Sequence, residues 1–175
     1  MDEIRKQKME DACWRLISNL EEILSRYRQL LDLVRKEKEA LQHFDISTIQ
    51  SINEKKEDLL TKIRFLDSTR ERYATELADL VGLDSEYPRL MELAKRVPGY
   101  LADKLRLSHA TLEIVLKRVQ QQNEENRLLV EAGLQTLQGA IADLKSSVTG
   151  SSVYRRDKKM DSGKDVAGAL RSTQV

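Results

Sequence analysis

The fold of this chain is decided by residues 9–44, which read MEDACWRLISNLEEILSRYRQLLDLVRKEKEALQHF. Apolar residues recur here at intervals of three and four, the spacing that places them on one face of an α-helix. Glu37 is the one charged residue in this seam, which consists of Met9, Cys13, Leu16, Leu20, Ile23, Tyr27, Leu30, Val34, Glu37, Leu41 and Phe44. A second stripe of Ile17, Leu24 and Leu31 widens the face, so we expect this helix to contact more than one neighbour.

The helical pattern stops after Phe44 and restarts at about Ile46. Asp45 can accept hydrogen bonds from the free N–H groups at the start of the next helix, and Phe44 is placed for a hydrophobic staple with Ile49. Gly82 is placed to end this second helix. Its seam consists of Ile49, Ile52, Lys56, Leu59, Ile63, Leu66, Arg70, Tyr73, Leu77 and Leu80. Two helices of similar length with a short reversal between them predict an antiparallel hairpin.

Glu37 and Lys56 each interrupt an otherwise apolar stretch of these seams. In a hairpin closed near Asp45 they lie within about one or two turns of each other. We hypothesise that they pair and thereby fix the register of the two helices.

Both prolines fall within residues 83–99, which we expect to be a connector with one short helix at 89–97. Pro98 suits the first turn of a long third helix that extends to about Lys145. The seam of that helix is expected at Leu105, His109, Leu112, Leu116, Val119, Asn123, Asn126, Val130, Gly133, Leu137, Ala140 and Leu144.

Two consecutive polar seam positions, Asn123 and Asn126, are expected to weaken packing on the hairpin and to split the third helix into halves. Gly133 and Gly139 loosen the distal half further, by roughly 1 kcal/mol each relative to alanine. That half carries an apolar stripe of Leu128, Leu129, Val130, Leu134, Leu137, Ile141 and Leu144. The stripe fits a bundle core, a homodimer core or a surface for another protein, and periodicity does not decide among these.

The expected fold class is therefore all-α: a long antiparallel helical hairpin, a short connector helix and a long third helix in a coiled-coil-like bundle. Residues 1–145 are long enough for one domain but too short for two independent cores. Residues 146–175 begin with a Ser-rich stretch and remain polar, so we expect a flexible tail that is disordered in the free protein.

Charge and composition argue against several partners. The net charge is +1, and residues 1–145 hold 24 basic against 26 acidic side chains, without the basic stripe that a nucleic acid requires. Apolar runs are short, so we expect no membrane insertion, and the N-terminus lacks the apolar core of an export signal.

The sequence also lacks the groups of an active site, so we expect no enzyme, no metal and no cofactor. Cys13 lies in an apolar seam, where burial keeps a thiol neutral and unreactive. His43 and His109 lie far apart in the sequence and suit capping or packing roles better than metal binding.

Three short elements in order resemble the FlgN family of flagellar export chaperones. They are a Glu-x-x-Ala-Leu element at 37–41, a Lys-x-x-Leu-Leu element at 56–60 and an Asn-x-x-Asn-x-Leu-Leu element at 123–129. The resemblance covers about residues 13–155. Val153 and Tyr154 resemble the aromatic element that often follows the last helix in this family, but Arg155 and Arg156 stand where a more acidic continuation is expected.

The resemblance implies a cytoplasmic chaperone that binds the C-terminal helical ends of hook-associated proteins of the hook-filament junction and delivers them to the flagellar type III export apparatus. Such amphipathic ends would be covered by an apolar helix face of the chaperone. The expected client-binding residues are Leu128, Leu129, Val130, Leu134, Leu137, Ile141, Leu144, Val148, Val153 and Tyr154. The alternative is a structural coiled-coil adaptor or homodimeric tether unrelated to secretion, because self-association of the stripe is possible.

Overall fold

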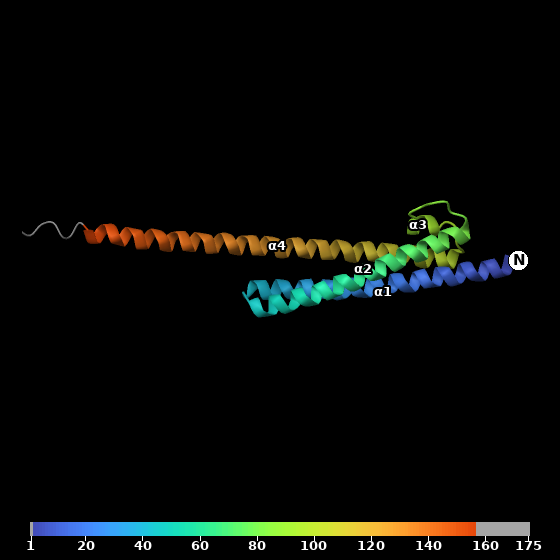
Figure 1. Cartoon of the computed structure of the whole chain (residues 1–175), viewed down its shortest axis with the longest axis horizontal. Coiled ribbons are helices and arrows are strands. Elements are labelled where there is room, and N and C mark those ends of the chain that lie inside the picture. Colours follow the sequence, from blue (N-terminus) through green and yellow to red (C-terminus); the bar gives the residue numbers. More distant parts are fainter. Residues whose placement is uncertain (1, 157–175) are drawn as a thin grey trace, which may run out of the picture. The chain divides into compact units, whose positions relative to one another are not determined.

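The computed structural model describes residues 2–156, with side chains described from residue 3 to residue 148. This range is helical, with α1 at Asp2–Gln42, α2 at Ile46–Val81, α3 at Leu90–Leu93 and α4 at Gly99–Arg156. α1 and α2 lie side by side as an antiparallel hairpin, as the sequence predicts (Figure 1). The chain divides into two units, one ending at Val130 and the other beginning at Glu131.

Asp45 is the N-cap of α2, as expected. Its carboxylate accepts hydrogen bonds from the backbone N–H of Thr48 at 3.1 Å, from the Thr48 hydroxyl at 2.6 Å and from the Ser47 hydroxyl at 2.8 Å. The bond from the Thr48 N–H satisfies a backbone donor that the first turn of a helix otherwise leaves without a partner, and the two hydroxyl bonds hold the carboxylate in place.

α1 ends in a Schellman motif whose left-handed residue is Phe44, with φ +53°. The N–H of Asp45 donates to Ala40 O at 3.0 Å and the N–H of Phe44 to Leu41 O at 3.3 Å. A left-handed conformation costs a residue other than glycine about 1–2 kcal/mol. The Phe44 side chain is 76 % exposed, so its predicted place in the apolar seam and in a staple with Ile49 is wrong: the reversed backbone turns it outward.

α2 ends in the same motif, but with glycine at the left-handed position. Gly82 has φ +66°, its N–H donates to Asp79 O at 3.4 Å, and the N–H of Leu83 donates to Ala78 O at 2.9 Å. Glycine adopts this conformation without steric cost, which explains why α2 stops where the sequence predicts.

The first unit contains two clusters of buried side chains. One lies where the start of α1, the end of α2, α3 and the start of α4 meet, and it includes Cys13, Leu16, Leu20, Leu77, Leu93, Leu101 and Leu105. The other joins the last third of α1, the middle of α2 and the first half of α4 through Leu30, Leu31, Val34, Leu59, Ile63, Val115 and Val119. The predicted seam and second stripe of α1 supply side chains to both, which confirms that α1 packs against more than one neighbour.

The face of α4 that packs on the hairpin is rotated slightly from the predicted seam. Val115 is buried and Leu116 only partly so, while Asn123 is exposed. Leu105, Val119 and Asn126 are buried, as the predicted seam requires.

Two predicted boundaries also differ. The short helix expected at 89–97 is limited to Leu90–Leu93, and its capping Arg89 N–H donates to the Glu92 carboxylate at 3.4 Å. α4 begins directly after Pro98, as expected, but continues to Arg156 and not only to Lys145. Residues 157–175 of the expected tail lie outside the described residues, and the domain division at 145 stays a prediction.

Candidate interaction surface

A polar network joins the three long helices within the first unit. Lys56 Nζ lies 2.9 Å from both carboxylate oxygens of Glu37. Asn126 Nδ2 donates to Glu37 Oε2 at 3.0 Å and to Val34 O at 2.9 Å. The side chains of Glu37 and Lys56 are 12 % and 19 % exposed, so this charge pair is largely removed from water and depends on its partners. That the pair fixes the helix register stays a prediction.

Asn126 has a different role from the one its sequence position indicates. We expected Asn123 and Asn126 to loosen the third helix from the hairpin, but Asn126 is only 4 % exposed and bonds directly to α1. A second contact at the same level supports this attachment, because Lys38 Nζ lies 2.7 Å from Glu125 Oε2. The Lys38 ammonium is the main reason that the pKa of Glu125 is lowered. α4 is therefore tied to α1 at this point and not released from it.

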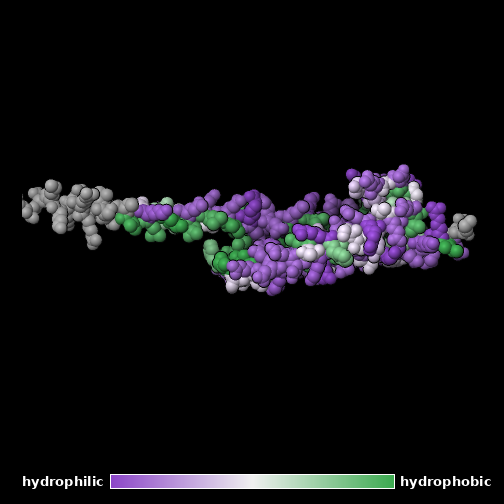
Figure 2. Space-filling model, in the orientation of Figure 1, coloured by the Kyte–Doolittle hydropathy of each residue, from purple (hydrophilic) through white to green (hydrophobic). Residues whose placement is uncertain are grey.

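The apolar stripe begins immediately after this attachment. Leu128, Leu129 and Val130 in the first unit are each more than a third exposed. In the second unit the exposed members are Leu134, Leu137, Ile141, Leu144 and Val148. Figure 2 shows hydrophobic side chains gathered along one side of the helix over these distal residues.

The helical repeat places most of this stripe on the face of α4 that is buried earlier in the same helix. At about 100° per residue, positions 130, 134, 137, 141, 144 and 148 fall within about 80° of Asn126 and share its side of the helix. The buried Leu101, Leu105 and Val119 fall in the same sector. Leu128 does not, because it lies about 200° from Asn126. The stripe is therefore an apolar packing face that continues, exposed, from position 130 onward, and Leu128 lies apart from it.

Val153 and Tyr154, also expected to bind the client, belong to the last turns of α4. Their side chains lie outside the described residues. They stay a prediction.

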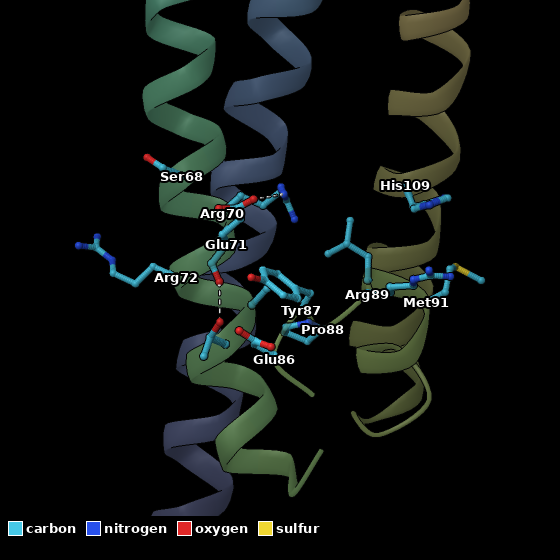
Figure 3. A pocket seen from close by; sticks show the side chains of 13 residues that line it. Ser68, Arg70, Glu71, Arg72, Glu86, Tyr87, Pro88, Arg89, Met91 and His109 are labelled. Carbon is cyan, nitrogen blue, oxygen red and sulfur yellow. Dashed lines mark hydrogen bonds and ion pairs between the residues drawn. The ribbon is translucent and has the colours of Figure 1, made fainter. Parts of the chain in front are cut away.

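A separate groove of about 820 Å³ lies between α2 and the connector before α3. Figure 3 shows Tyr87 and Pro88 between Glu71 on α2 and the Met91 and His109 side chains opposite. Arg70 Nε donates to Asp67 Oδ1 at 2.7 Å, so one of the charges in the lining is already paired. The lining mixes charged, aromatic and aliphatic groups without the hydrogen-bonded nucleophile and base that covalent catalysis uses.

The described residues contain no cluster of three or more His, Cys, Asp or Glu side chains suited to a metal ion. Cys13 is fully buried, and burial raises the pKa of its thiol to about 11. A thiol in that state is a poor nucleophile at neutral pH, in agreement with the packing role predicted for it. Between residues 2 and 156, no helix is long and apolar enough to cross a membrane.

Sequence reasoning missed the exposed apolar end of the hairpin, where Phe44 is 76 % and Ile46 is 62 % exposed. A signal was present: the residue between a helix and the Asp cap of the next one often adopts the left-handed conformation, where glycine or asparagine is preferred. A phenylalanine at such a position is unusual and is directed away from the helix pair.

Comparison with known proteins gives one family. The family model described as FlgN protein matches residues 9–162. No curated protein and no solved structure matches the chain.

Proposed function

Since residues 9–162 match the family model, the chain belongs to the FlgN family, and from this premise we propose that it binds the C-terminal helical ends of hook-associated junction proteins in the cytoplasm. FlgN proteins are flagellar export chaperones, so the family makes this chain a chaperone of flagellar assembly. The proposal adds the clients, the binding residues and delivery of the clients to the flagellar type III export apparatus.

The exposed stripe of α4 is the observation that carries the proposal. Leu137, Leu144 and their neighbours repeat at three- and four-residue spacing and remain exposed, although the same face of α4 is buried up to Asn126. Contiguous exposed apolar surface of this kind marks interaction sites, and an amphipathic helix matches its periodicity. A client helix on this face would be shielded from aggregation until export.

The test compares two leucines of α4 that are similarly exposed, Leu144 at 65 % and Leu107 at 68 %. Leu107 lies about 100° from Asn126 on the side away from the stripe, so Leu107→Asp is the matched control. We expect Leu144→Asp to weaken binding of a peptide from the C-terminal end of a hook-associated protein by tenfold or more, which is about 1.4 kcal/mol. Fluorescence anisotropy of the labelled peptide, titrated with the full chain and each variant, measures the change in affinity.

Equal affinity of both variants would contradict the assignment of the stripe. A tight dimer in light scattering that ignores the peptide would instead support the homodimeric tether, since the same face could pair with a second copy.

A further inference from the structure

The two ends of the hairpin helices use the same backbone motif with different residues. At the end of α2 the left-handed position is Gly82, and at the end of α1 it is Phe44. The hydrogen bonds are equivalent, from Leu83 N to Ala78 O at 2.9 Å and from Asp45 N to Ala40 O at 3.0 Å. The chain thus places at one of these ends a residue that the motif disfavours.

Folding does not account for the phenylalanine at this position. Its ring is 76 % exposed and therefore contributes little to the core, and its backbone is in a conformation that glycine adopts more easily. The next apolar side chain, Ile46, is also exposed, at 62 %. Phe44 and Ile46 are thus two large apolar side chains exposed within three residues of each other, and exposed aromatic residues, phenylalanine included, are enriched at protein interfaces.

We propose that this hairpin end, Phe44 and Ile46, is a docking surface for the amphipathic helical segment of the flagellar client. The inference rests on the proposed function and, within the first unit, extends its surface from Leu129 and Val130 to the turn between α1 and α2.

Continuity with the apolar face of α4 argues for this occupant. Within the first unit α1 and α4 run in the same direction. The starts of both helices lie in one core cluster, and further along both helices Asn126 of α4 bonds to Val34 of α1. One turn after Asn126, on the same face of α4, come Leu129 and Val130, both exposed. At 1.5 Å per residue, Phe44 lies only about one to two turns beyond their level. A helix that packs on these two residues therefore has the hairpin end within reach.

The chain offers a matched control, because its only other phenylalanine, Phe65 on α2, is 72 % exposed. In the full chain, Phe44→Ala should weaken binding of the hook-associated C-terminal peptide at least tenfold, and Phe65→Ala should leave it unchanged. Phe44→Gly should lose affinity to the same degree while its unfolding temperature equals or exceeds that of the unmodified chain, because glycine removes the left-handed strain. This second variant separates binding from folding.

One outcome is that the unmodified chain binds the peptide, Leu144→Asp weakens this binding, and Phe44→Ala and Phe44→Gly bind the peptide normally. In that case the hairpin inference is overturned and the proposed function stands. If the unmodified chain does not bind the peptide at all, the hairpin inference and the proposed function fail together. If Phe44→Ala disrupts a dimer of the chain and leaves peptide affinity unchanged, the occupant is a second copy and the inference is overturned.

Discussion

At the scale of single residues, Asp45 gives a prediction for acid stability. Hydrogen bonds from the Thr48 hydroxyl, the Thr48 N–H and the Ser47 hydroxyl lower the pKa of its carboxyl from 3.8 to about 2. Because the folded pKa is depressed, the stabilisation is complete above the unfolded pKa and is lost as pH falls through the folded pKa. We expect the stability difference between the chain and Asp45→Asn to shrink between about pH 4 and pH 2.

Urea unfolding followed by circular dichroism at several pH values checks this. Comparing the two proteins at each pH removes the contribution of the other carboxylates, among them Glu124 and Glu125, whose pKa values are also lowered. A difference that stays constant across this range would show that the cap does not depend on the charge of Asp45.

Also at the residue scale, the sequence predicted the roles of residues that depend on their own local backbone. It did not predict the role of a residue that depends on contacts between two helices. Asp45 and Gly82 were predictable because caps depend on neighbouring backbone groups. Asn126 was not, because its two hydrogen bonds go to α1, 92 and 89 residues earlier in the chain. The same amide looks like a packing defect in the sequence and is an attachment point in the structure.

At the scale of elements, α1 was predictable almost residue by residue, whereas the packing face of α4 was not. α1 lies against both other long helices, so nearly all its seam positions are apolar and a single phase fits the pattern. α4 offers Val115 beside Leu116, and either suits an apolar seam. Which of them faces the hairpin depends on how α4 lies against α1, and periodicity does not contain that information.

The pairing of α1 with α2 gives a prediction for Glu37 and Lys56. Reversing either charge alone leaves two like charges in a largely buried position, so Glu37→Lys and Lys56→Glu should each destabilise the chain, toward the roughly 3–5 kcal/mol typical of a broken buried pair. The double reversal should recover part of this loss, with a coupling of about 0.5–3 kcal/mol in a double-mutant cycle. Full recovery is not expected, because a lysine at position 37 cannot accept the hydrogen bond that Asn126 Nδ2 donates to the glutamate.

Denaturant unfolding of the four proteins measures the coupling. Solvent screens an exposed ion pair, so its two charges couple only weakly. The same cycle at the exposed pair Arg127 and Glu124 is therefore a suitable comparison. Additive single effects at Glu37 and Lys56 would rule out a role in fixing the register.

At the scale of the whole molecule, the sequence predicted the all-α architecture and the apolar stripe, because both follow from periodicity along one helix at a time. The hairpin end was missed because Phe44 continues the apolar spacing of α1 and so resembles a core residue. In the structure the backbone at that position is left-handed and the ring is 76 % exposed, so it points outward. Surface residues whose exposure depends on the geometry of a turn are therefore the part of the proposed docking surface that one-dimensional patterns do not predict.

The division of the chain at Val130 gives the last prediction, for amide hydrogen exchange. Residues 131–148 expose their apolar face and include Gly133 and Gly139, and a helix with little tertiary packing is only marginally stable in water. We expect their amides to exchange much faster than those around Leu16 and Leu20 in α1, which open only with the core. Addition of the hook-associated peptide should slow exchange over 131–148, since a bound helix stabilises the form it contacts. Strong protection of this segment in the free chain, independent of peptide but dependent on protein concentration, would mean that a second copy already covers it and that the chain acts as a tether.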